Sequence, residues 1–250
     1  MTEEGVRREY VDPSRRWSLA AAVATVTAVG GLLALDRLWT AGPPPEFLLG
    51  VGTVLGLELA VFRRTIRRAT REAGPERLTL ASWVTIGRGT ALALLAGFVV
   101  AGPPMASLAW APGILYALAA GLDAVDGTLA RARGAVTELG ARLDGEVDSL
   151  TVLVGATAAV SYGAAPVFFL AVGLAGYLFA FGKWWRRRRG LSVSALPENR
   201  FRRPFGAGAM VVVWLALLPI PGEEITRPLA AAVTVPFLLN FLTDWLAITR

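Results

Sequence analysis

Residues 121–148 read GLDAVDGTLARARGAVTELGARLDGEVD and contain four of the seven aspartates of this 250-residue chain. The members of the first pair stand three residues apart and those of the second pair four residues apart, so on helices each pair shares one face. A turn between the pairs would bring the two faces together, where four carboxylates repel one another unless cations neutralise them. The stretch therefore predicts two helices that hold a cation site between them, built from Asp123, Asp126, Asp144 and Asp148.

The chain contains no cysteine and no histidine. Disulfides, thiol nucleophiles, zinc sites of the Cys/His type and histidine acid–base catalysis are therefore excluded. Metal chemistry must use oxygen ligands, which suit the hard divalent ions Mg²⁺ and Mn²⁺. Because carboxylate-held Mg²⁺ usually completes its shell with water and substrate phosphate, the cluster favours a phosphate-containing ligand.

Small residues accompany the aspartates. Gly127 and Ala130 leave the helix face bare, so that a bulky polar ligand can approach the backbone, and Arg131 can clamp a phosphate with two hydrogen bonds. Gly140 plays the same part on the second helix, where Thr137, Gly140 and the second aspartate pair form one continuous stripe. These residues predict a metal-bound diphosphate held between the two helices.

The rest of the chain has the composition of a membrane protein. Apolar residues make up 54% and charged residues 18% of the sequence, and the mean hydropathy is +0.53. A span needs about 20 mainly apolar residues. Because eight stretches come near that length, we expect an all-α integral membrane protein of about eight transmembrane helices, at about residues 17–39, 46–62, 79–101, 105–125, 146–163, 165–185, 205–220 and 227–247.

The basic residues follow an alternating pattern. The formal net charge is +6, and the basic segments fall on every second connection between spans. Arginine and lysine are retained on the cytoplasmic side, so the pattern predicts a multi-pass protein of the cell (inner) membrane, with the aspartate site and both termini cytoplasmic and no cleaved signal peptide. It also accounts for the positive charge without nucleic-acid binding. The basic segments are 7–16, 63–77, 131–142, 183–203 and the terminal Arg250.

The aspartate region as a whole resembles a known family. The pattern D-x2-D-G-x2-A-R-x8-G-x3-D-x3-D is met at every position and resembles the motif of the CDP-alcohol phosphotransferase (CDP-alcohol phosphatidyltransferase) family. The resemblance covers about residues 78–247, whose six spans correspond to the six-helix core of the family. We therefore expect a core domain over residues 78–250 and an N-terminal region, residues 1–77, that adds two helices.

The resemblance implies a reaction and its ligands. In this family a CDP-lipid, such as CDP-diacylglycerol or CDP-archaeol, gives its phosphatidyl group to an alcohol and releases CMP. The four aspartates would hold two divalent ions, Mg²⁺ or Mn²⁺, and Asp148 would also be the base that takes the proton of the acceptor hydroxyl. A homodimer in the bilayer is also implied. The residues expected to contact the CDP-lipid are Gly127, Ala130, Arg131, Thr137, Gly140, Ser82 and Thr85.

The first core span departs from the family at one position. Members often carry Asn-x-x-Thr-x-x-Arg here, whereas this chain has Ser82, Thr85 and Arg88 in the same frame. An arginine inside an apolar stretch costs about 2.5–3.5 kcal/mol on insertion scales, which favours a place facing the site. Arg88 is thus expected to meet either substrate phosphate or an acidic neighbour, with interfacial snorkelling as the alternative.

Other charged residues leave alternatives open. Arg200, Arg202 and Arg203 either bind a phosphate on the acceptor or simply belong to a basic cytoplasmic loop. Glu58 and Asp244 are expected to pair with local arginines. Glu146 lies off the face of the second aspartate pair and is expected to be structural.

Two other functions compete with phosphatidyl transfer. An intramembrane prenyltransferase also binds a diphosphate through Mg²⁺, but carries two aspartate motifs far apart in sequence, whereas this chain has one cluster. A non-catalytic metal-binding membrane scaffold is the other alternative, against which the intact set of four aspartates argues. The acceptor alcohol stays open, with glycerol 3-phosphate, inositol phosphate and serine all served by the family.

Overall fold

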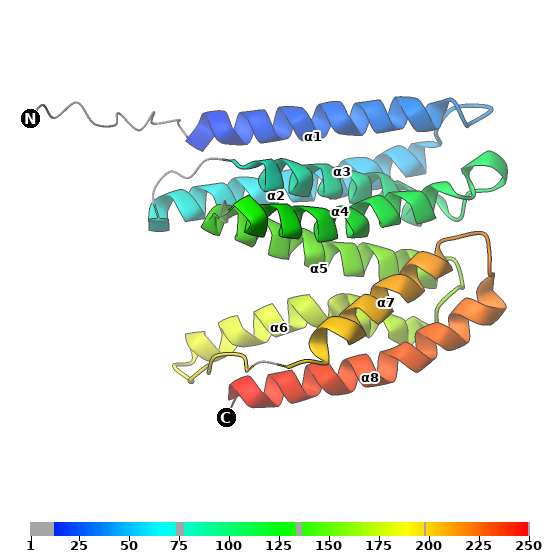
Figure 1. Ribbon diagram of the computed structural model, residues 1–250. Helices are drawn as coiled ribbons and strands as arrows, with labels where there is room; N and C mark the ends of the chain where they lie inside the picture. The colour runs from blue at the N-terminus through cyan, green and yellow to red at the C-terminus, as the bar shows by residue number, and fades with distance from the viewer. Residues whose placement is uncertain (1–12, 74–77, 134–136, 198, 250) are drawn as a thin grey trace, which may run out of the picture.

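The computed structural model is all-helical over the residues it describes, which are 13–73, 78–133, 137–197 and 199–249, with the backbone alone at 13, 73 and 123–133. This confirms that the protein is all-α, as predicted. The long helices run side by side and the chain turns alternately at the two ends of the bundle, so that α1 begins and α8 ends at the same end (Figure 1). The α-helices are α1 (Pro13–Asp36), α2 (Pro45–Ala73), α3 (Leu80–Ala101), α4 (Ala111–Arg133), α5 (Glu138–Ser161), α6 (Leu170–Arg188), α7 (Arg202–Ala216) and α8 (Glu223–Thr249).

Fewer helices than expected meet the requirements of a span. Among the described residues, five are long and apolar enough to cross a membrane, so the expected number of eight is not confirmed. The described apolar stretch Ala106–Leu122, which includes the first part of α4, is short, and the end of α5 near the aspartates is charged. The helix α7 has only 15 residues. The five candidates are Ser14–Asp36, Pro45–Glu72, Leu80–Ala101, Val167–Arg188 and Glu223–Thr249.

Two helices continue well beyond their predicted apolar spans. The helix α2 runs on to Ala73 through an arginine-rich segment, and α5 begins at Glu138, ahead of the apolar part of its sequence. The start of α5 is fixed by Thr137, whose hydroxyl accepts a hydrogen bond from the backbone N–H of Gly140 at 3.0 Å. Hydropathy locates the membrane-embedded part of a helix, whereas caps and propensity decide where the helix ends.

The first two helices pack on the remainder of the bundle through small residues. A Cβ at Gly50 of α2 would lie 2.7 Å from the carbonyl oxygen of Ala96, and one at Gly97 of α3 would lie 2.6 Å from the Phe47 ring. Glycine at both positions lets the two backbones approach closely, as at other helix contacts in membranes. The added helices therefore dock directly on α3.

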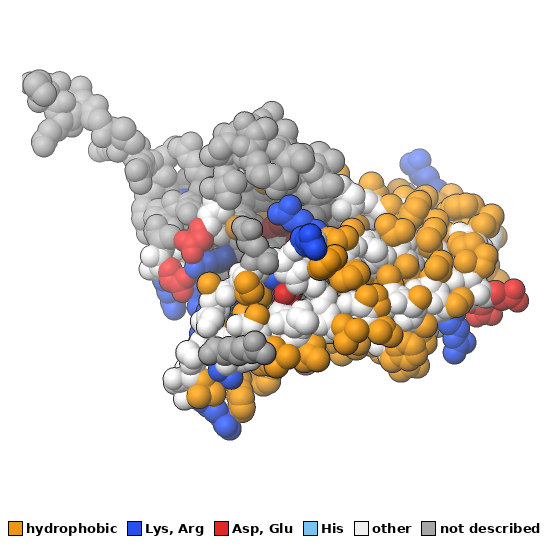
Figure 2. All heavy atoms as spheres, turned by 60° about the horizontal axis from the view of Figure 1, so that its bottom comes forward, with side chains coloured by type: hydrophobic (Ala, Val, Ile, Leu, Met, Phe, Trp, Pro, Cys, Tyr) orange, Lys and Arg blue, Asp and Glu red, His pale blue; other side chains and the backbone are white. Residues whose placement is uncertain are grey.

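The outer surface of the bundle is hydrophobic. Large apolar side chains such as Val26, Leu33, Phe181 and Val235 are exposed, and Figure 2 shows hydrophobic side chains over a broad part of one face. An exposed apolar surface of this kind suits contact with lipid rather than water. Together with the five candidate spans, it indicates a multi-pass membrane protein.

Candidate active site

Arg88 of α3 is the buried centre of the site. Its side chain is 0% exposed, and its two terminal nitrogens donate hydrogen bonds to Asp144 Oδ1 and Asp148 Oδ1, each at 2.6 Å. The remaining guanidinium nitrogen, Nε, donates to the carbonyl oxygen of Ala119 in α4 at 2.7 Å. Of the alternatives for Arg88, the structure shows the acidic neighbour. One side chain thus ties α3, α4 and α5 together.

Asp144 and Asp148 lie one turn apart on α5 and share one face, as their spacing predicted. Each carboxylate contacts Arg88, yet the side chains are 38% and 40% exposed. They are therefore anchored from the protein interior and remain accessible from the other side. A charge-assisted pair with arginine keeps both carboxylates oriented before any ligand arrives.

The first aspartate pair lies on the last turns of α4. Asp123 and Asp126 belong to the part of α4 whose side chains are outside the described residues, as do Gly127, Ala130 and Arg131. Among the side chains that are described, no group of three or more potential metal ligands occurs. Convergence of all four aspartates therefore stays a prediction.

The described donors suit a divalent metal ion. Asp144 and Asp148 offer only oxygen atoms, and both carboxylates reach the same partner from one helix face. Hard ions such as Mg²⁺ and Mn²⁺ prefer such ligands. Because two carboxylates one turn apart repel each other, the positive charge of a metal ion would stabilise them.

The beginnings of α3 and α5 lie next to each other beside the aspartates. A Cβ at Gly140 would lie 2.9 Å from Thr137 Oγ1 and 3.6 Å from Ser82 Oγ. Ser82 is buried and forms a capping box with Thr79, in which each side chain accepts a hydrogen bond from the backbone of the other. Thr85 is buried as well, and its hydroxyl donates to the carbonyl oxygen of Ala81. Three of the predicted CDP contacts, Ser82, Thr137 and Gly140, therefore gather at this point.

A second ion-pair group connects the added helices to the site. Arg142 of α5 pairs with Glu72 of α2 at 2.7 Å and with Glu138 of its own helix. Hydrogen bonds to Glu72 and Glu138 raise the pKa of Arg142 above its ordinary value. The end of α2 thus holds the first turn of α5, two residues before Asp144.

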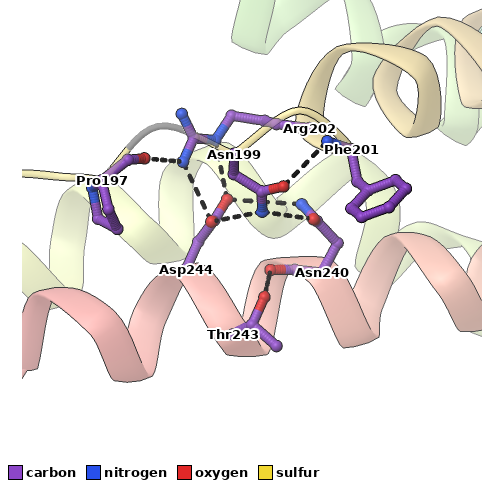
Figure 3. A network of polar contacts seen from close by, with 7 residues as sticks. All are labelled: Pro197, Asn199, Phe201, Arg202, Asn240, Thr243 and Asp244. Atoms are coloured by element: carbon purple, nitrogen blue, oxygen red, sulfur yellow. Dashed lines mark hydrogen bonds and ion pairs between the residues drawn. The ribbon is translucent and has the colours of Figure 1, made fainter.

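The predicted acceptor arginines lie at the start of α7. Arg200, Arg202 and Arg203 line a surface hollow of about 890 Å³ together with Asn199 and Phe201. Figure 3 shows that Arg202 is held by the carboxylate of Asp244 on α8, with N–O distances of 2.9 and 3.1 Å. Asp244 therefore pairs with an arginine, but this arginine comes from α7 and is 42 positions away rather than local in the sequence.

Asn199 completes this network, and its role was not predicted. Its side-chain amide donates to Asn240 at 2.7 Å and to Asp244 at 3.0 Å, and its oxygen accepts from the backbone N–H of Phe201 (Figure 3). Arg202 also donates to the carbonyl oxygen of Pro197. The loop before α7 is therefore fixed to α8. An isolated asparagine in a basic loop gave no signal for such contacts.

The prediction that Glu58 pairs with a local arginine is wrong. Within the described residues Glu58 forms no ion pair, and its buried Oε1 has no hydrogen-bond partner. A Cβ at Gly89 would lie 3.1 Å from either carboxylate oxygen, so Glu58 packs against the α3 backbone. Glu146 is exposed on α5, and its side chain lines a pocket of about 290 Å³ together with Glu58 and Tyr177.

A family model for CDP-alcohol phosphatidyltransferase matches residues 78–246, which is more than half of the chain. The chain belongs to the CDP-alcohol phosphatidyltransferase family. Comparisons with curated proteins and with solved structures gave no match. Members of this family are transferases of phospholipid biosynthesis in membranes and are generally dependent on divalent metals. Membership confirms the resemblance carried by the aspartate motif, and it supports phosphatidyl transfer from a CDP-alcohol over the prenyltransferase alternative. The matched residues begin just before α3, so α1 and α2 precede them.

Proposed function

We propose that this protein moves a phosphatidyl or archaetidyl group from a CDP-lipid to the hydroxyl of an alcohol and releases CMP. The observation that carries the proposal is the pair Asp144 and Asp148, anchored by buried Arg88 and partly exposed on the other side, in a chain of this family. The site would face the cytoplasm, because the arginine-rich ends of α2 and α6 lie at the same end of the bundle (Figure 1).

The proposed reaction assigns each described group a task. Asp148 accepts the proton of the acceptor hydroxyl, whose oxygen forms a bond to the lipid-bearing phosphorus as the bond from that phosphorus to CMP breaks. Arg88 holds Asp144 and Asp148 in place from behind. Two Mg²⁺ or Mn²⁺ ions, held by Asp123, Asp126, Asp144 and Asp148, would supply positive charge to the diphosphate.

We place the CDP part of the donor at the beginnings of α3 and α5. Thr137, Gly140 and Ser82 lie together there. Gly127, Ala130 and Arg131 follow the first aspartate pair on α4, and Thr85 lies one turn after Ser82. A lipid donor would leave its chains among the apolar helix surfaces, and a homodimer in the bilayer is part of the proposal.

For the acceptor we favour a phosphorylated alcohol, such as glycerol 3-phosphate or inositol phosphate. Arg200 and Arg203 would bind the phosphate in the hollow that they line, and Arg202, already held by Asp244, would fix the loop that presents them.

Purified protein, supplied with radiolabelled CDP-lipid, Mn²⁺ and a panel of alcohols, should release CMP with one of them. Replacement of Arg200 and Arg203 by Gln should raise the KM of a phosphorylated acceptor, whereas Arg187→Gln on α6 should not. Release of no CMP with any acceptor would refute transferase activity, as a non-catalytic scaffold predicts.

A further inference from the structure

A groove at the end of α2 lies on the two helices that precede the family-matched residues. It has a volume of about 860 Å³ and is lined by Trp17 of α1 and by nine residues of α2 between Gly56 and Glu72. Its floor is apolar and consists of Gly56, Leu59 and Ala60, whereas its rim carries the five arginines between positions 63 and 71. The groove therefore has an apolar part and, next to it, a strongly basic part.

Specific contacts hold the wall of the groove. The indole N–H of Trp17 donates to the carbonyl oxygen of Leu59 at 3.3 Å, and the guanidinium of Arg63 lies 5.2 Å from the centre of the Trp17 ring. The tryptophan and the first arginine of the rim are thus engaged with each other, which sets α1 against α2 at this level.

Among the described residues, little negative charge offsets the arginines of the rim. Arg68 pairs with Glu72 at 2.8 Å, and Glu72 also pairs with Arg142. Arg64, Arg67 and Arg71 form no ion pair with a described residue, and all three are exposed. Five arginines against one glutamate give the lining a formal charge of +4. An anion is the ligand that this rim would recognise.

We propose that the groove binds an anionic phospholipid of the surrounding membrane, with its chains on the apolar floor and its phosphate among Arg64, Arg67 and Arg71. The apolar floor lies within the candidate span Pro45–Glu72 and the arginines follow it towards the helix end, so the groove passes from apolar to basic as a lipid leaflet does from chain to head group. A soluble phosphate could use the rim only. This lipid would bind to α1 and α2, and its binding does not depend on the transferase reaction.

Native mass spectrometry of the full-length protein in detergent tests this site, with phosphatidylglycerol as the anionic probe and phosphatidylcholine as the neutral one. Charge is removed by the triple variant Arg64→Gln, Arg67→Gln, Arg71→Gln. A matched control removes three arginines at the end of α6 instead, at positions 187, 188 and 189. Near an anionic head group each arginine contributes about fivefold in affinity, so the groove triple variant should weaken phosphatidylglycerol binding more than tenfold.

A second pair of variants tests the floor without changing any charge. No atom lies within 4 Å of a Cβ built on Gly56 or on Gly52, so both positions can accept a side chain. Gly56→Leu fills the floor of the groove, whereas Gly52→Leu lies one turn away and outside its lining.

The proposal expects one tightly bound phosphatidylglycerol on the wild type, weaker binding in the groove triple variant and in Gly56→Leu, and unchanged binding in the α6 variant and in Gly52→Leu. If Gly56→Leu binds phosphatidylglycerol as tightly as the wild type does, the lipid is attracted by charge alone and the proposal is overturned. Equal loss in the α6 variant would overturn it as well. Displacement of the lipid by inorganic phosphate at equal concentration would show a site for soluble anions instead.

Discussion

Replacement of Arg88 by methionine should destabilise the protein markedly, because it removes the guanidinium that bridges α3 to Asp144 and Asp148 of α5. Hydrogen bonds to charged groups contribute about 1.5–3 kcal/mol each, and breaking a buried ion pair from one side costs about 3–5 kcal/mol. With described carboxylates Arg88 makes two such bonds, and it is wholly buried. Asp144 and Asp148 are 38% and 40% exposed, so water can solvate them in part once the arginine is gone. We therefore expect a loss of about 3 kcal/mol, the lower end of the range for a buried pair.

The free energy of unfolding, measured by denaturant titration in micelles, tests this estimate. Arg88→Lys keeps the charge but lacks the forked head group, so it should fall between the wild type and Arg88→Met. Arg187→Met serves as the matched control, since this arginine is exposed on α6, and it should change stability by less than about 0.5 kcal/mol. A double-mutant cycle with Asp144→Asn should give a coupling of about 1 kcal/mol or more. If Arg88→Met unfolds like the control, the bridge does not stabilise the bundle and the reasoning fails.

Three further predictions concern packing, capping and metal. Gly155→Leu should lower the free energy of unfolding by at least about 2 kcal/mol, since a Cβ at this position alone would lie 2.4 Å from the Tyr116 ring. Gly145→Ala on the same helix should be tolerated, because no atom lies within 4 Å of a Cβ built there. Thr137→Ala should lower the stability by about 1 kcal/mol through loss of the α5 cap on the Gly140 N–H, and a thermal shift indistinguishable from zero would argue against the cap. Chelation of divalent ions should abolish CMP release and readdition of Mn²⁺ or Mg²⁺ should restore it; full activity after exhaustive chelation would contradict a metal-dependent site.

Local spacing predicted which residues share one face of α5. The four-residue separation of Asp144 and Asp148 fixes their shared face on any helix, and both do lie together on α5. Thr137 and Gly140 fall on the same stripe, and the cap at the start of α5 brings them into contact. Such features follow from helix geometry alone and need no knowledge of the other helices.

Features that depend on how helices cross were not predictable. Arg88 meets carboxylates 56 and 60 positions away, and the choice between phosphate and carboxylate as its partner required the packing of α3 on α5. Glu58 lies near arginines in sequence, yet the close approach of α2 to α3 directs it against Gly89. The expected eight spans are not confirmed, in part because α5 combines an apolar segment with charged residues of the site.

In the proposed reaction, Asp148 takes part in the release of CMP from a CDP-lipid. The most direct test compares Asp148→Asn with Glu146→Gln, a carboxylate two positions away on α5 that lies off the aspartate face. CMP release from radiolabelled CDP-lipid is measured in the presence of Mn²⁺ and the acceptor that the wild type uses. We expect Asp148→Asn to bind the CDP-lipid but to release no CMP, whereas Glu146→Gln keeps wild-type turnover. Turnover by Asp148→Asn at the wild-type rate would show that Asp148 is not the base.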